Sequence, residues 1–391
     1  MLAIKSIYNV FKREVKEIAH NGLYFTSLIV LPIVVISLFT LIFFRGSVEQ
    51  LPIAVVNSDH SVMSRQLIAM LEASRGIGDI SEVYTMEDAN SLIRGGEVRA
   101  IVVIPDDFER SITSGNTTEV ISSISGANLS TAGVLKRDIQ QVVQSFSAGV
   151  AASRLNSIGY SNTQAMVDVM PINVHIHTIS NPYMNYGYYL APMFMFVGMA
   201  LFIVLNTIYA IGRELRYSTT QEWISAARGS LLSAMIGKLL PTTIVMIAMM
   251  MVIYFALFVI MGMEAMCSWS MFGFSSLMLI LAYHSVAVMI IALAANMRLA
   301  LSLGGGYAVM AFTFSGITFP TLSMYGVAQL LAKLFPLSYF SDIFITQALR
   351  GADVSYSIDS FVYLGIFSLL WIFVWPRLSR VVCNEQYWRK D

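Results

Sequence analysis

Few residues of this chain stand in a pattern that could carry out catalysis. The pair Gly237-Lys238 lacks both the upstream glycine and the following Ser or Thr of a P-loop, so the chain does not hydrolyse ATP in that way. It contains no HExxH zinc motif and no G-x-S-x-G nucleophile elbow. Its two cysteines, Cys267 and Cys383, form neither a CxxC pair nor a zinc-binding spacing. We therefore expect no catalytic residue, metal site or cofactor on this chain.

Three histidines could still take part in binding or proton transfer. His284 is the one clear ionisable residue inside the apolar segments, and we interpret it as a helix–helix hydrogen bond rather than a transport residue. His175 and His177 share a face of a predicted strand, but no third metal ligand lies nearby, so a solvated face is the preferred interpretation. Ion-coupled transporters usually need buried carboxylates, so energy for any transport must come from elsewhere.

The composition indicates that much of the surface lies in lipid. The chain has 391 residues, of which 56% are hydrophobic and 12% charged, whereas soluble domains are about 45–50% apolar and about 25% charged. A helix needs about 20 apolar residues to cross the hydrocarbon layer. Six segments qualify, at roughly 23–44, 188–211, 239–263, 270–295, 299–319 and 361–375. The 24 basic and 24 acidic residues cancel, so charge suggests no nucleic-acid partner.

Lys and Arg concentrate in four short segments that a six-span arrangement puts on one side of the membrane. These are the N-terminal stretch, the link between the second and third spans, the link at Arg298, and the tail at 377–391. Short loops rich in Lys and Arg stay in the cytoplasm, so we expect both termini there. The long polar region then lies outside, where its length exempts it from the charge rule.

Two further segments can be placed around these spans. Residues 1–22 are expected to form an amphipathic helix in the headgroup layer, because apolar residues recur at helical spacing. Those residues are Ile4, Ile7, Tyr8, Phe11, Val15 and Ile18. Residues 45–185 carry the alternating signals of an α/β domain. We expect strands at 52–56, 100–104, 119–124 and 173–179, and helices at 61–73, 86–93 and 131–157.

The sequence thus predicts an α-helical polytopic membrane protein with six transmembrane helices and an inserted extracytoplasmic α/β domain. The first transmembrane helix covers 23–44, and the other five lie within 186–376.

The cytoplasmic link at 212–238 is long enough to present a helix to a partner. Thr219 or Thr220 can cap a short helix that continues through Gln221 and Glu222. Glu222 lies near the helix start, where the helix dipole favours an acid. Trp223 is the residue type that anchors interfaces. The alternative is a simple interfacial hairpin between two spans.

A second unusual segment follows the fifth span. Phe319-Pro320 and Phe335-Pro336 bracket an apolar stretch that is too broken to cross the membrane. We interpret about 320–350 as a re-entrant or surface hairpin on the outer side, lined by protein rather than lipid. An ordinary extracellular loop is the alternative.

Together these segments resemble the ABC-2 class of ABC exporter permeases. In that family the cytoplasmic link carries a Gly-Thr-x-Glu-like coupling helix that ends near a Gly-Lys pair. The matching residues here are Arg213-Glu214, Thr220-Gln221-Glu222 and Gly237-Lys238. The glycine usual before the threonine is replaced by Ser218 or Thr219.

The family's last-but-one segment reads Ser-Gly-x-x-Phe-Pro, then Met, then Pro-Leu-Thr-Tyr. Here it reads Ser315-Gly316-Ile-Thr-Phe319-Pro320, Met324 and Pro336-Leu337-Ser338-Tyr339. One span, a large outer domain and five more spans also follow the family's order, so the resemblance covers the whole chain.

The resemblance implies a permease dimer, of two copies or of two paralogues, with two cytoplasmic ATPase subunits that bind ATP and Mg²⁺. Substrate would move outward across a bacterial inner membrane, and some members with such a domain work with a periplasmic adaptor. The implied coupling residues are Glu214, Thr220, Gln221, Glu222, Gly237 and Lys238, and Trp223 joins them because of its residue type. The implied hairpin residues are Ser315, Gly316, Phe319, Pro320, Pro336 and Tyr339.

The rival hypothesis is a membrane receptor or assembly protein that uses its outer domain for binding and transports nothing. A receptor has no need of a helix for ATPase docking, so the link at 212–238 discriminates between the two. A membrane-bound enzyme is less favoured, because the chain lacks a catalytic constellation.

Overall fold

The computed structural model describes residues 2–44, 46, 49–161, 185–316 and 319–388. The chain divides into two compact units. One comprises Met1–Gly46 and Ile179–Asp391, and the other is Ser47–Thr178. The predicted strand at 173–179, with His175 and His177, lies outside the described residues.

The smaller unit is an α/β domain around a four-stranded sheet. Its strands are β1 (Leu51–Asn57), β2 (Ile77–Val83), β3 (Ala100–Ile104) and β4 (Ile121–Ile124). The order is β2-β1-β3-β4, with β1 parallel to β2 and β3, and β4 antiparallel to β3. Val55 pairs with Glu82 on one side and Val102 on the other. The two central strands are continuous apolar runs because both of their faces are covered by helices.

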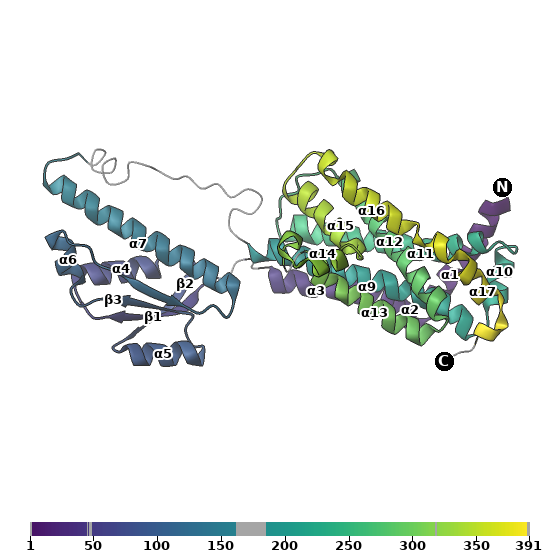
Figure 1. Cartoon of the computed structure of the whole chain (residues 1–391), viewed down its shortest axis with the longest axis horizontal. Helices are drawn as coiled ribbons and strands as arrows, with labels where there is room; N and C mark the ends of the chain where they lie inside the picture. Colours follow the sequence, from purple (N-terminus) through teal and green to yellow (C-terminus); the bar gives the residue numbers. More distant parts are fainter. Residues whose placement is uncertain (1, 45, 47–48, 162–184, 317–318, 389–391) are drawn as a thin grey trace. The chain divides into compact units, whose positions relative to one another are not determined.

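Helices cover both faces of this sheet (Figure 1). They are α4 (Val62–Glu72), α5 (Met86–Gly95), α6 (Phe108–Ser114) and α7 (Leu129–Ser157). Leu67, Phe108 and Phe146 bring α4, α6 and α7 into one apolar core, and Ala89 of α5 packs in a separate core on the other face. β2 and α6 were not predicted. β2 is an edge strand with mostly half-exposed or exposed residues, so its apolar signal is weak.

The larger unit contains six helices long and apolar enough to cross a membrane, among the residues described. They cover Gly22–Phe43, Gly187–Arg216, Leu231–Ile260, Trp269–Ala294, Met297–Phe314 and Val354–Cys383. The predicted fold class, a helical polytopic membrane protein with an inserted α/β domain, is confirmed.

The helical elements of these spans can be named individually. They are α2 (Gly22–Phe25), α3 (Leu31–Phe43), α9 (Tyr186–Arg216), α11 (Leu231–Phe255), α12 (Trp269–Ala294), α13 (Met297–Phe314), α16 (Ile358–Ser368) and α17 (Leu370–Cys383). π-helical turns at Thr26–Val30 and Ala256–Ile260 complete the first and third spans. Helices outside the spans are α1 (Leu2–His20), α10 (Thr220–Ala226), α14 (Gly326–Ala332) and α15 (Pro336–Ile343).

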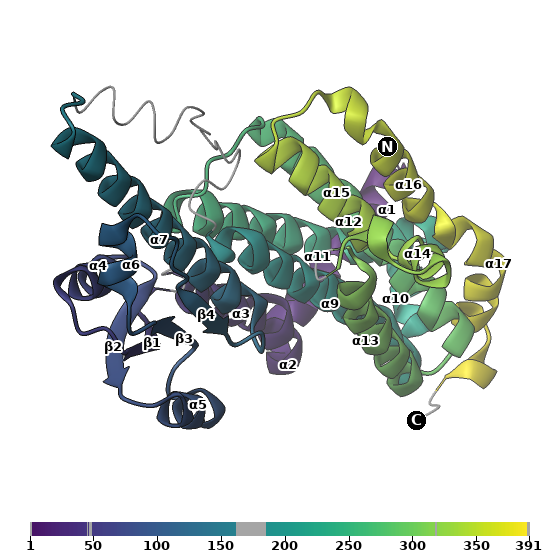
Figure 2. The same cartoon turned by 60° about the vertical axis from the view of Figure 1, so that its left-hand side comes forward.

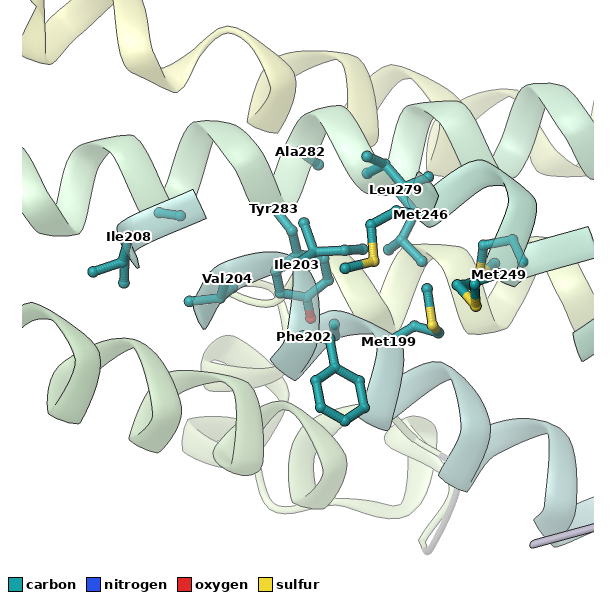
Figure 3. Packing of buried hydrophobic residues seen from close by; sticks show 14 of the residues in the cluster. Met199, Phe202, Ile203, Val204, Ile208, Met246, Met249, Leu279, Ala282 and Tyr283 are labelled. Atoms are coloured by element: carbon teal, nitrogen blue, oxygen red, sulfur yellow. The ribbon is translucent and has the colours of Figure 1, made fainter. Parts of the chain in front are cut away.

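Helix α9 lies at the centre of the bundle, in contact with α3, α11, α12 and α13 (Figure 2). Methionines fill much of the space between these helices. Figure 3 shows Met199 of α9 beside Met246 and Met249 of α11, and all three are buried. Flexible thioether side chains suit such irregular gaps, so pliable packing explains their abundance.

Candidate functional site

Four segments that are distant in sequence meet at one end of the bundle. Arg13 of α1 contacts Glu214 at the end of α9, and Gln221 of α10 donates a hydrogen bond to Glu385 beyond α17. Gly212 packs against Met297 at the start of α13. The structure therefore brings together the four segments in which Lys and Arg concentrate.

A buried charge cluster, formed by Arg13, Glu14, Glu214 and Lys238, joins the helices at this end. The ammonium group of Lys238 lies 2.6 Å from Glu14 Oε2 and 2.7 Å from Glu214 Oε1. Arg13 holds the same Glu214 with two nitrogens, at 2.6 and 3.0 Å. Two acids and two bases cancel, which makes burial of all these charges tolerable.

The member of the charge cluster nearest to the protein surface is Arg13, in α1. Burial on its own would lower the pKa of the Arg13 guanidinium, but the hydrogen bonds and charge of Glu214 raise it above its ordinary value. On the other side, the Tyr24 hydroxyl donates a hydrogen bond of 3.0 Å to Glu14 Oε1. This hydrogen bond satisfies the Glu14 oxygen that Lys238 does not bind.

Helix α10 is held directly on this cluster. Thr219 donates a hydrogen bond to the Glu214 carboxylate, and the Thr220 hydroxyl donates to the Glu214 backbone oxygen at 3.0 Å. The Trp223 indole donates to the Ala234 carbonyl at 3.2 Å, and Lys238 Nζ lies 5.1 Å from the centre of its ring. A movement of α10 must therefore displace groups bonded to α9 and α11.

Trp223 lies inside the unit, with its side chain fully buried. It is therefore not part of the surface that a partner could contact directly, and its effect on ATPase coupling stays a prediction. The Trp223 indole fixes α10 to the first turn of α11. The exposed residues of α10 and the turn after it are Gln221, Glu222, Ser225, Arg228, Gly229 and Ser230.

The predicted link at 212–238 is shorter in the structure. Residues 212–216 end α9 and residues 231–238 begin α11, which leaves 217–230 for α10 and its two turns. Glu214 and Lys238 thus lie within helices that are long enough to span the membrane. The sequence placed both residues outside the spans, because charged residues at the end of an apolar segment are difficult to assign from hydropathy.

The backbone geometry favours glycine at two positions of this site. Ser218, one of the two residues that could replace the family's glycine, has φ +57°, in the left-handed region that glycine adopts most readily. At Gly237 a Cβ would lie 2.6 Å from the Ile7 carbonyl oxygen and 2.8 Å from Val10. Gly237 therefore allows α1 to lie directly on α11.

The sequence did not reveal the part of this site that comes from α1 and α2. The face of α1 that is buried carries Ser6, Val10, Glu14 and Ile18, spaced by four residues. Ile4, Tyr8 and Val15, which were expected to form the membrane-facing stripe, are exposed. The recurrence of these residues at every fourth position was the available signal. Glu14 is one of them, however, and a glutamate is not expected to be buried unless its partner is known.

The predicted hairpin lies at the opposite end of the bundle and consists of two short helices, α14 and α15. Ser315 is buried, and Gly316 has φ +81° where the chain leaves α13. Phe319 and Pro320 are exposed, whereas Pro336 is buried at the first turn of α15. Residues 317–318 lie outside the described residues.

Helix α15 is embedded in the bundle through aromatic contacts. Phe340 meets Phe196 of α9 with ring centres 4.9 Å apart. Tyr339 stacks on Tyr363 of α16 at 4.7 Å, and its hydroxyl donates to the Lys333 carbonyl. The Ser338 hydroxyl donates to Ala332 O at 2.8 Å. This end is fixed mainly by ring packing and local hydrogen bonds.

His284 connects three helices near the middle of the bundle. Its Nδ1 lies 2.6 Å from Thr207 Oγ1 of α9, and its Nε2 lies 3.0 Å from Thr243 Oγ1 of α11. The imidazole is buried. This geometry agrees with the interpretation of His284 as a helix–helix hydrogen-bonding residue.

Comparison with known proteins gives one family. The family model described as "ABC-2 family transporter protein" matches residues 22–375. This range includes the α/β unit, α10 and the candidate spans, and it ends in the middle of α17. No match was found among curated proteins.

Proposed function

Because this chain belongs to the ABC-2 family of transporter proteins, we propose that it is the permease of an ATP-driven exporter whose ATPase is a separate subunit. Family membership makes the chain a multi-pass membrane protein and a permease of an ABC transporter, and such permeases normally work with a cytoplasmic ATPase. Outward transport, the bacterial inner membrane and the orientation of the chain are parts of the proposal. Cytoplasmic placement of the end with α1 and α10 is supported by its Lys and Arg residues.

The observation that carries the proposal is the attachment of α10 to the charge cluster. An ATPase that moves α10 would displace Thr219 and Thr220, and both hydroxyls bond to Glu214. Glu214 is bonded in turn to Lys238 of α11 and Arg13 of α1. A displacement at the surface is thereby passed to two spans and to the N-terminal helix at once.

The same cluster favours mechanical coupling over ion coupling. Glu14 and Glu214, the buried carboxylates at this end, both lie within 2.7 Å of the Lys238 ammonium. An ion-coupling carboxylate must exchange its proton or ion with water during the cycle. Ion-paired carboxylates buried under α1 and α10 are poorly placed for that, so contact with a partner is the better source of energy.

The exposed edge of α10 is the proposed docking surface. Glu222 is exposed there, and Gln221 and Arg228 lie beside it. ATP and Mg²⁺ would be bound by the ATPase alone. A second permease, identical or paralogous, and in some systems a periplasmic adaptor would complete the transporter.

Charge reversal at Glu222 tests this surface. We expect Glu222→Lys to weaken ATPase binding roughly tenfold, which corresponds to about 1.4 kcal/mol. ATP hydrolysis stimulated by substrate should fall with it. Binding is measured by copurification with the ATPase, and turnover is measured in proteoliposomes.

Glu264→Lys is the matched control, because Glu264 is also exposed but lies at the opposite end, between the third and fourth spans. It should leave docking unchanged. Undiminished docking and turnover in Glu222→Lys would refute the coupling role of α10.

A further inference from the structure

A cavity of about 330 Å³ lies between α11, α12 and the sixth span. It shares no residue with the charge cluster or with the exposed edge of α10. Its wall includes Met235 and Leu239 of α11, Leu281 and Val288 of α12, and Trp371 and Trp375 of α17. The volume is in the range of sites that hold small molecules or parts of larger ones.

The cavity lies where the sixth span is broken. Helix α16 ends at Ser368 and α17 begins at Leu370. The Trp371 backbone N–H donates to the Ser285 hydroxyl oxygen of α12 at 2.7 Å. A side chain inserted into the helical hydrogen-bond ladder is a recognised cause of a kink. Ser285 therefore fixes the break and places Trp371 in the cavity wall.

The hydroxyl and imidazole groups on the cavity wall, those of Thr243, His284, Ser285 and Ser368, are already engaged within the protein. Both ring nitrogens of His284 lie within hydrogen-bonding distance of threonine hydroxyls. Thr243 is one of those partners, and Ser285 accepts from Trp371. A charged or strongly polar group would lose its hydration here without a compensating partner, so the wall selects an apolar occupant.

The cavity opens on the outer surface of the helix bundle. Leu232, Ile236 and Leu240 line the opening and are 47%, 44% and 39% exposed. Since these residues belong to helices that are long and apolar enough to cross a membrane, lipid chains can reach the opening directly.

We propose that this cavity binds one acyl chain of a membrane phospholipid, which enters from the side between α11 and α17. Trp371 and Trp375 lie at the level where α17 approaches its charged end at Arg377 and Arg380. Tryptophan is favoured at the boundary between hydrocarbon and headgroups. The acyl chain enters the cavity, and the lipid headgroup stays at this boundary. This binding does not depend on the ATPase.

Photo-crosslinking with a lipid probe tests the site. The protein is placed in nanodiscs that contain phosphatidylglycerol with a diazirine in the middle of one acyl chain, irradiated, and mapped by mass spectrometry. We expect the label to concentrate on the cavity residues of α11, α12 and α17. Leu281→Trp, which fills the cavity, should lower this labelling roughly fivefold or more.

Ile244→Trp is the matched control, because Ile244 is a residue of α11 that is 51% exposed and lies outside the cavity. It should leave labelling of the cavity unchanged. Val288→Phe is a milder filling variant if Leu281→Trp does not elute as a single species. Labelling of the cavity no stronger than that of the exposed Leu303 on α13, or labelling unaffected by both filling variants, would overturn the proposal.

Discussion

The two ends of the transmembrane bundle are held together by different chemistry. At the end with α10, the buried cluster of Arg13, Glu14, Glu214 and Lys238 joins three helices through ion pairs of 2.6–2.7 Å. At the end with α15, aromatic rings such as Tyr339 and Phe340 pack against neighbouring spans. Removing one member of a buried charge cluster leaves another charge without a partner and strongly destabilises the protein. Removing one ring from an aromatic cluster costs less.

This difference suits different tasks. Ion pairs with fixed partners keep the helices in a defined arrangement, which suits the proposed transmission of a displacement from α10. Aromatic packing tolerates small shifts between rings, which suits the movement of the spans that the proposed transport requires. Four experiments test whether the two ends differ in this way.

The largest expected effect is at Lys238. Lys238→Met leaves two buried carboxylates without their shared partner, and such a change typically costs about 3–5 kcal/mol of unfolding free energy. Thermal denaturation in detergent measures the loss. Lys333→Met, which removes an exposed lysine at the other end, should cost under about 0.5 kcal/mol. Equal effects of the two variants would show that the charge cluster is not needed for stability.

Cysteine labelling tests whether the two ends lie on opposite sides of the membrane. Cys267, near the end with α15, should react with an impermeant thiol reagent from outside, and Cys383 only after permeabilisation. Burial raises the pKa of Cys267 to about 11. The reactive thiolate is therefore scarce at neutral pH, and its labelling should rise about a hundredfold from pH 7 to pH 9. Reaction of both cysteines from one side would exclude the six-span arrangement.

A smaller effect is expected at the aromatic end. Tyr339→Leu removes the stacking on Tyr363 and the hydrogen bond to Lys333 but keeps an apolar side chain. The loss should be about 1–2 kcal/mol, measured by the same thermal denaturation. Tyr325→Leu is the control, since Tyr325 is 84% exposed and should have little effect. A loss as large as that of Lys238→Met would remove the contrast between the two ends.

The smallest effect is expected at Ser218. Its φ of +57° is unfavourable for a side chain, so Ser218→Gly should be neutral or stabilise the protein by up to about 1 kcal/mol. Ser225→Gly, inside α10, should instead destabilise by roughly 0.5–1 kcal/mol. If both variants lower the denaturation temperature equally, the turn before α10 does not favour glycine.

Local patterns predicted much of this molecule. The apolar segments gave the number of spans, because crossing the hydrocarbon layer requires a continuous run of suitable length. The strands β1 and β3 were evident from short apolar runs, and α5 from its Gly-Gly end, where Gly96 has φ +76°. β2 and α6 were missed because an exposed edge strand and a seven-residue helix leave weak periodic signals.

The candidate site was predicted only in part. Thr220, Gln221 and Glu222 could be assigned to a short helix, and Glu214, Gly237 and Lys238 to the same link. Their distribution between surface and interior could not be foreseen, because it depends on helices that are joined only in the folded chain. The inward position of Trp223, for example, depends on a hydrogen bond to Ala234 in the following span.

Apolar length and short motifs are enough to show that the chain crosses a membrane and which family it resembles. The pairing of Lys238 with Glu14, a residue 224 positions away, is set by the folded structure. A buried charge is tolerable only beside an opposite one, and that neighbour is supplied by the packing of α1 on α11 through Gly237. No local pattern contains this information, since either residue alone is typical of an exposed position.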